Sequence, residues 1–428
     1  MPASTAAAPI RLGPRFTLLW SGEGVSLLGT ATTSVLLPLL AVTHFNAGPG
    51  WMGLLTAAAW LPWLLVGLPA GAWVDRLDPR AVMITADLIA AATLASVPVG
   101  WWLGFLTLRQ LSGVALLGGT TAVFFHTGYV RLLPMIVPDQ GLETANARLS
   151  GTESAMQIAG PGFAGLLAQL VTAAAGIVLD VVGFLASAFC LWRIKINPPH
   201  KTDRAPVERL RDRIAEGVRV VTRDRHLRVF MVIGSVSNFG LTGYATLLVL
   251  YLVDDLGLSP ARLGLVLMIG GIGGLLGALV APSLARRTGS GRASTVLLVC
   301  AGPSALLVGA PTDARHAYLT SLGLLLVGAA VVAGNVIRGT WRQRYVPAHL
   351  LGRVVTTMQV VNYGTMPLAG LAAGTLGTHL GVRPAILLLA AVHALASLSV
   401  LLTHVGRERT LPSHAADHEQ LEQTPGPP

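Results

Sequence analysis

The sequence predicts an all-α membrane protein in which twelve transmembrane helices form two six-helix halves. Of its 428 residues, 53% are hydrophobic and only 12% are charged, and this charged share is about half that of a soluble protein. The chain divides into twelve mostly apolar runs, each near the roughly 20 residues that a helix needs to cross a bilayer. Several glycines and prolines recur at one spacing, which indicates a duplication. This composition excludes a disordered protein, a coiled coil and an ordinary cytosolic enzyme.

Turn-forming residues mark the joints between the predicted spans. Gly48-Pro49-Gly50 follows the first span, Pro138 to Gly141 follows the fourth, and Ser259-Pro260 follows the seventh. The first span is too long for a signal peptide and leads directly into another span. The twelve predicted spans are 16–43, 51–74, 81–106, 109–134, 146–173, 175–195, 228–253, 262–285, 293–311, 316–340, 352–379 and 382–404.

The longest polar stretch separates the first six spans from the last six. We therefore divide the chain into a cytoplasmic N-terminal segment (1–15), a first six-helix half (16–195), a cytoplasmic linker (196–227), a second six-helix half (228–405) and a disordered cytoplasmic tail (406–428). Within the linker, four apolar residues stand at helical spacing among charged ones. They predict an amphipathic helix lying at the inner membrane surface: Leu210, Ile214, Val218 and Val221.

The distribution of basic residues predicts the orientation. If the N-terminus lies in the cytoplasm and the spans alternate, the inner segments hold 26 of the 30 lysines and arginines. The outer side then holds Arg109, Arg262, Arg315 and Arg383. Because cytoplasmic loops carry an excess of basic residues, we expect both termini in the cytoplasm. The net charge of +10 then reflects topology, and we expect no nucleic-acid partner.

An internal repeat supports the two-half organisation. Gly71 and Gly277 are 206 residues apart, and so are Pro161 and Pro367. Many transporters are built from duplicated halves, with the substrate site between them near the middle of the bilayer. Chance spacing in a chain with 49 glycines is the alternative.

A charged motif follows the second span, from Gly71 to Arg80, and reads GAWVDRLDPR. It resembles the G-x-x-x-D-R-x-x-x-R signature of the major facilitator superfamily. The resemblance implies a conformational latch that steadies the outward-facing state, formed by Gly71, Asp75, Arg76 and Arg80. Asp78-Pro79 departs from the usual Gly-Arg pair, and Ala281 replaces the aspartate in the second half. A loop whose arginines only set the topology is the alternative.

The fifth predicted span contains Gly160-Pro161-Gly162-Phe163-Ala164-Gly165. It resembles the G-P-x-x-G-G antiporter motif found mainly in exporters of the superfamily, with Gly160, Pro161 and Gly165 matching and Ala164 departing. Ordinary packing of small residues is the alternative. The longer stretches 131–165 and 351–374 are similar to the drug:proton antiporter branch that includes the enterobactin exporter and macrolide efflux proteins. The resemblance covers about residues 15–405.

Ionisable residues inside membrane spans are costly and are therefore functional candidates. We predict that Glu23, Glu153, Asp87 and His126 take part in proton coupling, because desolvation disfavours the charged form of a carboxyl group. The three carboxylates lie at a similar depth, about 10 Å inside their helices at 1.5 Å per residue. For Asp87, an ion pair with Arg131 is the favoured alternative.

Other polar residues in the spans predict a substrate cavity between the halves. Those of the first and fifth spans recur every three or four residues and so form stripes along one helix face. The predicted cavity residues are Ser26, Thr30, Gln157, Asn238, Asn335, Gln359, Asn362 and Tyr363. Arg338 is a further polar candidate, and we expect Asp180 to cap or pack a helix.

We predict no catalytic residue, no cofactor and no metal site, because the chain carries no phosphate-binding loop, metal-ligand cluster or nucleophile elbow. The resemblance implies a secondary active transporter in the cell membrane that exports an amphipathic drug, antibiotic or siderophore in exchange for protons. The expected partners are the small-molecule substrate, protons and the lipid bilayer, and we expect a monomer. The alternatives are an importer on the same fold and a non-transporting receptor or scaffold, although buried carboxylates argue against a scaffold.

Overall fold

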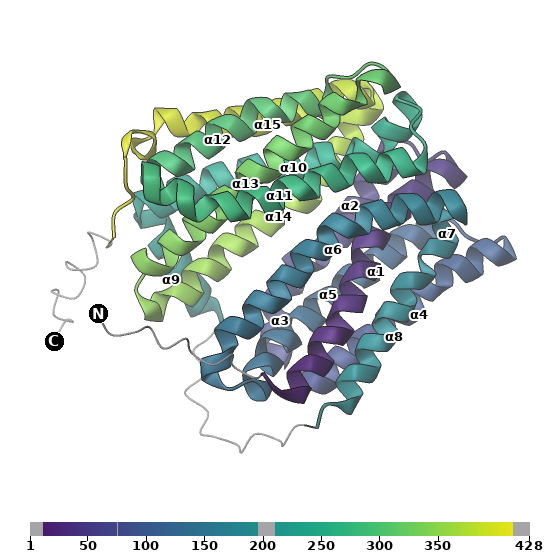
Figure 1. Ribbon diagram of the computed structural model, residues 1–428, viewed down its shortest axis with the longest axis horizontal. Helices are drawn as coiled ribbons and strands as arrows, with labels where there is room; N and C mark the ends of the chain where they lie inside the picture. Colours follow the sequence, from purple (N-terminus) through teal and green to yellow (C-terminus); the bar gives the residue numbers. More distant parts are fainter. Residues whose placement is uncertain (1–11, 75, 196–209, 414–428) are drawn as a thin grey trace, which may run out of the picture.

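The computed structural model describes residues 12–74, 76–195 and 210–413, and within these ranges it contains helices and no strand. The helices form two bundles that lie side by side (Figure 1). The first contains α1 (Gly13–Phe45), α2 (Pro49–Leu65), α3 (Gly67–Val74), α4 (Pro79–Leu103), α5 (Leu108–Ile136), α6 (Leu142–Leu170), α7 (Ala173–Gly176) and α8 (Val178–Arg193). After α9 (Leu210–Arg223), the second contains α10 (Arg225–Leu250), α11 (Pro260–Thr288), α12 (Ser290–Leu306), α13 (Ala317–Tyr345), α14 (Ala348–Leu380) and α15 (Val382–Leu398).

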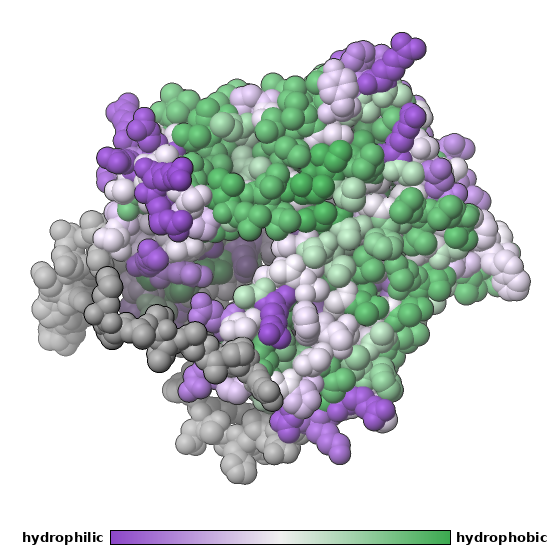
Figure 2. All heavy atoms as spheres, viewed as in Figure 1, coloured by the Kyte–Doolittle hydropathy of each residue, from purple (hydrophilic) through white to green (hydrophobic). Residues whose placement is uncertain are grey.

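The two ends of the molecule differ in charge. We call the end at which α1 begins and α9 lies the basic end, because most of the described arginines are found there; the opposite end is the far end. Figure 2 shows a broad apolar surface between polar residues at the two ends. Such a belt matches the hydrocarbon core of a bilayer flanked by its polar interfaces.

Eight helical segments are long and apolar enough to cross a membrane by length and composition alone. They are Gly13–Phe45, Pro79–Leu103, Ala173–Arg193, Arg225–Asp255, Pro260–Thr288, Ser290–Gly309, Ala314–Tyr345 and Val382–Leu402. The other four predicted spans correspond to the pair α2 and α3, and to α5, α6 and α14. The latter three are long helices that carry more polar side chains, which a membrane helix tolerates on a face turned away from lipid. The twelve-helix prediction therefore agrees with the fold.

The second predicted span is broken, and Pro69 explains the break. Proline has no N–H and clashes with the carbonyl four residues earlier, here that of Leu65, where α2 ends. In the second half, the corresponding α11 is continuous, and a Cβ atom on Gly277 would lie 2.1 Å from the Ala329 carbonyl oxygen of α13. A Cβ on Gly71 would meet nothing within 4 Å. The repeated glycines thus occupy different surroundings in the two halves.

The amphipathic helix expected in the linker is present as α9, but it packs on protein rather than only on lipid. Val221 is fully buried, and a Cβ on Gly217 would lie 2.7 Å from the Arg353 carbonyl oxygen of α14. Glu216 forms an ion pair with Arg353. Val218 is 42% exposed. The side chains of Leu210 and Ile214, and residues 196–209, lie outside the described residues.

The predicted disorder from residue 406 onward is wrong for the first part of the tail. The Trp341 Nε1–H donates to the Pro412 carbonyl oxygen at 2.9 Å, and the Leu411 N–H donates to the Ser290 hydroxyl at 3.0 Å. Leu411 is only 7% exposed. Residues 404–413, which we call the C-terminal strap, therefore pack on the basic end of the second bundle. Residues 414–428 lie outside the described residues.

Two helix pairs join the bundles at the far end. One pair is α2 with α14, where a Cβ on Gly53 would lie 2.5 Å from the Gly370 carbonyl oxygen. The other pair is α6 with α11, where a Cβ on Gly165 would lie 3.0 Å from the Gly264 Cα. Small residues allow such close backbone approach in membrane helices. Toward the basic end the bundles diverge, and Figure 2 shows a hollow between them.

Candidate functional site

An aromatic cluster joins the two bundles at the middle of the molecule. Its members are Trp60 and Trp63 of α2, His126 and Tyr129 of α5, and Tyr363 of α14. The Tyr363 ring centroid lies 5.7 Å from that of Trp60 and 5.3 Å from that of Trp63. The His126 ring lies 5.6 Å from Trp63 and 6.5 Å from Tyr129. Rings at these separations offer π-faces on which a planar amphipathic molecule can pack.

Two of the predicted proton-coupling carboxylates lie near this cluster. Glu153 of α6 is exposed and accepts a hydrogen bond from the Gln157 side chain at 3.3 Å. The Glu23 Oε2 atom of α1 is buried, with no hydrogen-bond partner among the described residues. The two carboxylates are close enough to interact electrostatically, and Glu153 also interacts with His126. The structure therefore brings Glu23, Glu153 and His126 together.

Asp87 is buried in the first bundle and is not paired as predicted. Its side chain is only 1% exposed, and its Oδ2 atom has no hydrogen-bond partner among the described residues. The Arg131 Nη1 instead donates to the Val74 carbonyl oxygen at 2.9 Å, at the end of α3. Asp87 lies beside Ser187 of α8. The predicted ion pair fails because the Arg131 side chain extends toward the basic end, away from the core that holds Asp87.

Asp180 packs against α1, in line with the expected packing role. It is only 1% exposed, and the Thr30 hydroxyl donates to its Oδ1 atom at 3.2 Å. A Cβ on Gly29 would lie 2.6 Å from the Asp180 Cα, so α1 and α8 are in backbone contact there. Asp180 is also close enough to Asp87 for an electrostatic interaction. The sequence did not indicate that Asp180 would join the buried carboxyl groups.

The predicted cavity residues Ser26 and Thr30 differ in exposure, because Ser26 is buried whereas Thr30 is exposed. Ser26 is 7% exposed, and a Cβ on Gly183 of α8 would lie 3.1 Å from its Cα. The Thr30 hydroxyl donates a hydrogen bond to Asp180 of α8. Both residues therefore contact α8 within the first bundle, because α1 has neighbours on more than one side. Gln157 of α6 is exposed beside Glu153.

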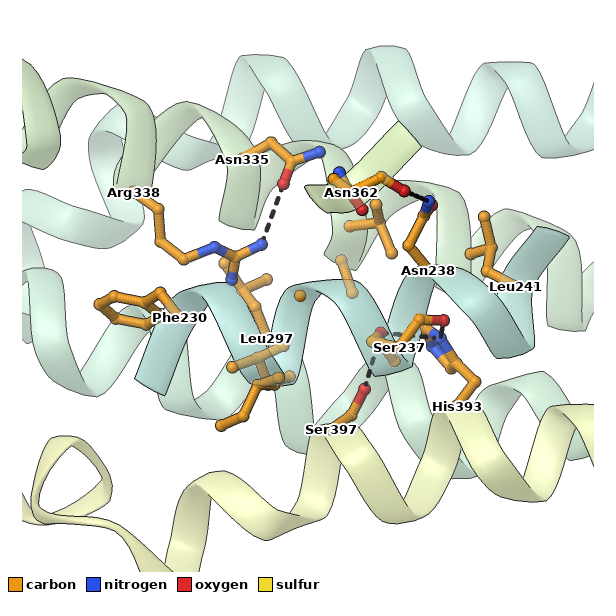
Figure 3. A pocket seen from close by; sticks show the side chains of 16 residues that line it. Phe230, Ser237, Asn238, Leu241, Leu297, Asn335, Arg338, Asn362, His393 and Ser397 are labelled. Atoms are coloured by element: carbon orange, nitrogen blue, oxygen red, sulfur yellow. Dashed lines mark hydrogen bonds between the residues drawn. The ribbon is translucent and has the colours of Figure 1, made fainter. Parts of the chain in front are cut away.

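A cavity of about 110 Å³ lies within the second bundle (Figure 3). It contains three of the predicted substrate residues, Asn238 of α10, Asn335 of α13 and Asn362 of α14. The Asn238 side-chain amide donates to the Asn362 carbonyl oxygen at 3.5 Å. Residues of α12 and α15 also line this cavity, although the sequence had placed the site between the halves. Of the remaining predicted residues of α14, Gln359 is exposed, and Tyr363 belongs to the aromatic cluster.

Arg338 of α13 extends into this cavity. Its Nη2 donates to the Asn335 side-chain oxygen at 3.0 Å, and its guanidinium carbon lies 6.0 Å from the Phe230 ring centroid. Figure 3 shows the guanidinium between Asn335 and Phe230. The Nη1 atom is buried, with no hydrogen-bond partner among the described residues. One turn further along the helix, the Arg342 Nη1 contacts the Met358 sulfur at 3.6 Å.

His393 of α15 is a titratable residue of the cavity that sequence reasoning missed. It is 1% exposed, and its Nδ1 lies 2.9 Å from the Ser237 hydroxyl and 3.0 Å from the Ser237 carbonyl oxygen. The Ser237 and Ser397 hydroxyls are 3.4 Å apart. His393 Nε2 is buried, with no partner among the described residues. In the sequence, this position is marked only by a single histidine within an otherwise apolar predicted span.

The predicted latch is only partly described. Asp75 lies outside the described residues, and Arg76 is exposed. The Arg80 Nε donates to the Leu191 carbonyl oxygen at 2.8 Å, and its Nη2 donates to the Trp192 carbonyl oxygen. These carbonyls end α8, where a cation also interacts favourably with the helix dipole. Arg80 therefore fastens the start of α4 to the end of α8.

The antiporter-like motif lies where α6 contacts two neighbours. A Cβ on Gly160 would lie 2.4 Å from the Ala31 Cβ of α1. The Pro161 carbonyl oxygen would lie 2.5 Å from a Cβ on Gly264 of α11, and Gly165 faces the same glycine. The motif thus sets the closeness of α6 both to its own bundle and to the other one.

At the basic end, the side chains of His226, His404 and Glu408 come together, a group that the sequence did not indicate. Their ligand atoms lie within 4.8 Å of one another and could hold a metal ion. His226 Nε2 lies 3.0 and 3.1 Å from the two Glu408 oxygens, so a hydrogen bond already fastens the C-terminal strap to α10. Partial burial, followed by repulsion from His226 and Arg225, lowers the pKa of His404.

Comparison with known proteins agrees with this architecture. A family model described as the Major Facilitator Superfamily matches residues 19–370. The multidrug efflux pump Tap of Mycolicibacterium fortuitum is 28% identical over 389 residues, which cover 88% of this chain and 92% of Tap. Macrolide efflux protein A of Streptococcus pyogenes is 24% identical over 272 residues, which cover 62% of this chain and 65% of that protein.

The fold is also shared with solved transporters. The nucleoside transporter NupG superposes with a TM-score of 0.68 at 13% identity, over 91% of this chain and 99% of NupG. This likeness supports the arrangement of two helix bundles, and the family match spans most of the chain. The protein therefore belongs to the Major Facilitator Superfamily of multi-pass membrane transporters.

Proposed function

We propose that this transporter exports an amphipathic small molecule across the cell membrane in exchange for protons. The observation that carries the proposal is the Glu23 carboxyl group, which interacts electrostatically with the exposed Glu153 and whose Oε2 atom is buried with no hydrogen-bond partner among the described residues. Desolvation disfavours the charged form of a carboxyl group, so such a group is suited to binding and releasing a proton. The similarity to the efflux pumps and the antiporter-like motif support export as the direction.

The orientation in this proposal follows from charge. The basic end faces the cytoplasm, because positively charged loops are retained on that side. The hollow then opens to the cytoplasm, and the contacts of α2 with α14 and of α6 with α11 close the outer side. This arrangement is the state that would load a substrate for export. Release requires the far-end contacts to separate while the basic end closes, with Asp75, Arg76 and Arg80 as the latch of that second state.

Protons pass, in this proposal, through the first bundle. Glu153 is exposed, Glu23 is partly buried, and Asp87 and Asp180 are almost fully buried, so the four carboxyl groups lead from the hollow into the bundle. Neighbouring members interact electrostatically. Like charges in close proximity disfavour simultaneous ionisation, so uptake of a proton at one group favours release at the next.

The substrate packs against the aromatic cluster of Trp60, Trp63, His126, Tyr129 and Tyr363. Aromatic rings contribute a large apolar contact area and tolerate varied ligand shapes. The polar cavity around Asn238, Asn335 and Asn362 receives a polar group of the same molecule. We propose that the protein works as a monomer, because each half supplies one side of this site.

Transport by everted membrane vesicles tests this proposal. An inside-acidic pH gradient should drive uptake of amphipathic dyes and antibiotics into vesicles that contain the protein, and dissipating the gradient should stop it. Glu23→Gln should abolish the gradient-driven component, whereas Glu143→Gln, which changes an exposed carboxylate at the start of α6, should not. Accumulation only in right-side-out vesicles would favour an importer. Absence of transport across a panel that includes neutral, cationic and anionic compounds would contradict the proposal.

A further inference from the structure

A guanidinium group that forms no ion pair with any described carboxylate lies inside the second bundle. Arg338 stands seven residues from the end of α13 at Tyr345, about 10 Å inside the helix at 1.5 Å per residue. Its Nη1 atom is buried and has no hydrogen-bond partner among the described residues. Its nearest polar partner is the neutral Asn335 side chain. A cation at membrane depth is costly unless an anion or several acceptors compensate it.

No carboxylate of the second half is placed to compensate Arg338. Of the described acidic residues from 215 to 413, Glu216 lies within α9, where it pairs with Arg353. The others lie at the ends of the membrane-spanning helices or beyond them: Asp224, Asp254, Asp255, Asp313 and Glu408. The residues that line the cavity include no acid. Arg342 interacts electrostatically with Arg338, which adds a second positive charge. The cavity is therefore positive, with neutral polar groups around it.

We infer that this cavity is an anion-binding subsite, which holds the carboxylate of an amphipathic substrate against Arg338. The inference deepens the proposed export function and rests on it for the identity of the ligand as a transported molecule. An arginine binds a carboxylate through two parallel N–H donors, and such charge-assisted bonds are stronger than neutral ones. The amide of Asn362 and the hydroxyl of Ser237 are further polar groups lining the cavity.

The size and position of the cavity indicate a subsite rather than a complete binding site. A volume of about 110 Å³ accommodates a carboxylate and a few neighbouring atoms, whereas sites for drug-sized ligands are about 300–1,000 Å³. Asn362 lines the cavity, and the ring of the next residue of α14, Tyr363, lies against those of Trp60 and Trp63. The acidic group and the apolar body of one molecule can therefore occupy the cavity and the aromatic cluster together.

Two aryl probes that differ only in charge test the inference. The purified full-length protein in lipid-free detergent is titrated with 2-naphthoate and with 2-naphthamide, and binding is measured by isothermal calorimetry. Wild-type protein should bind the carboxylate about tenfold more tightly than the amide, since a hydrogen bond to a charged group contributes on that scale. Equal affinities, or no measurable binding of naphthoate, would overturn the inference without any variant.

Arg338→Gln locates the effect. This variant should lose the preference for naphthoate while it still binds naphthamide, which also shows that it is folded. Arg338→Lys should retain part of the preference, because it keeps the charge but not the two-pronged geometry. Arg292→Gln, an exposed arginine at the same end on α12, is the matched control and should behave as wild type. A preference that survives in Arg338→Gln would assign the anion to another site.

Two further arms separate this inference from its alternatives. Lipid phosphate is the other oxyanion with this chemistry, and displacement of naphthoate by short-chain phosphatidylglycerol but not by phosphatidylcholine would assign the cavity to a lipid headgroup. Vesicle transport of acidic and neutral probe pairs tests the link to export. Export without any acid preference would overturn the inference and leave the proposed function intact. Naphthoate binding through Arg338 without export of any compound would contradict the proposed function and leave the anion subsite standing.

Discussion

Gly165 of α6 and Gly264 of α11 face each other across the two bundles with no room for a side chain on either. A Cβ on Gly165 would lie 3.0 Å from the Gly264 Cα, and a Cβ on Gly264 would lie 2.5 Å from the Pro161 carbonyl oxygen. Gly165 and Pro161 belong to the antiporter-like motif. The motif therefore does more than fill space within one bundle, because its small residues permit the far end to close.

Gly165→Leu should prevent this closure and shift the protein toward a state open at the far end. Overpacking a close contact costs about 1–3 kcal/mol, enough to change the ratio of two states by roughly one to two orders of magnitude. Export should fall accordingly. The measurement is the reactivity of a cysteine at Met268, which packs near Gly162 in the same contact, toward an impermeant thiol reagent added at the far side.

That experiment has a matched control in Gly113→Leu. A Cβ on Gly113 of α5 would meet nothing within 4 Å, so this variant adds the same side chain at an open position. The background lacks Cys190 and Cys300, the two native free thiols. Unchanged labelling at position 268 in Gly165→Leu would show that the glycine contact does not control the far end.

Asp87→Asn should uncouple export from the proton gradient while leaving the protein folded. Asparagine has nearly the same shape, and the Asp87 carboxyl has no described basic partner that would lose an ion pair. Had Asp87 served only to pair with Arg131, the loss would appear in stability instead. Transport and the thermal unfolding midpoint are therefore measured on the same preparation. A lower midpoint with full proton-driven export would restore the structural role.

Glu153→Gln and Glu23→Gln should separate coupling from substrate binding. Both variants should bind substrate in the absence of a gradient, and the pH dependence of that binding should weaken. A larger effect is expected for Glu23→Gln than for Glu153→Gln, because the Glu23 Oε2 atom is buried whereas Glu153 is exposed. If both single variants keep full proton-driven export, the coupling role passes to Asp87, Asp180 or His126.

Asp75→Asn and Arg80→Gln should have different consequences. Asp75→Asn should nearly abolish transport without loss of stability, because a neutral side chain cannot pair with the arginines of the latch. Arg80→Gln should also lower stability, by about 1–3 kcal/mol, because the Leu191 and Trp192 carbonyl oxygens lose a charged donor. Transport at the wild-type rate by Asp75→Asn, at equal expression, would remove the latch assignment.

Much of the fold was predictable because several helices begin at turn-forming residues. Pro49 begins α2 and Pro260 begins α11, close to the predicted starts at 51 and 262. The break after Leu65 was not predicted, although Pro69 was visible, because a single proline can bend a membrane helix as well as interrupt it. The ordered C-terminal strap was missed because its polar sequence carries no periodic signal, and its order depends on contacts such as Trp341 with Pro412.

The candidate site was harder to predict than the fold. Helical spacing put Ser26 and Thr30 on one face of α1, but spacing does not say which neighbouring helix covers that face, and both residues contact α8. Asp87 and Arg131 are complementary in charge, yet the direction of the Arg131 side chain separates them. His393 gave no pattern at all, because one histidine in an apolar span is compatible with lipid, core or cavity.

Cysteine labelling locates the water-filled path. Cysteines at Gln157, Asn238 and Gln359 should react with a small polar thiol reagent added from the basic end, because Gln157 and Gln359 are exposed and Asn238 lines the cavity, each on a different helix. A cysteine at Ser26 should stay unreactive, since this position is covered by α8. Substrate should protect position 238 most strongly, because Asn238 lines the proposed subsite.

Val236→Cys and Leu368→Cys are the matched controls. Val236 lies two residues from Asn238 on α10, and Leu368 lies on α14, the helix that carries Gln359. Both apolar side chains are exposed on the outside of the described bundle. A thiol in hydrocarbon does not ionise and should therefore react slowly, whatever its apparent exposure. If the control cysteines react as fast as the cysteine at position 238, or if the cysteine at position 26 reacts strongly, then these helices present other faces to water than the structure shows. The coupling and subsite assignments depend on the same helix faces, so that result would remove their basis as well.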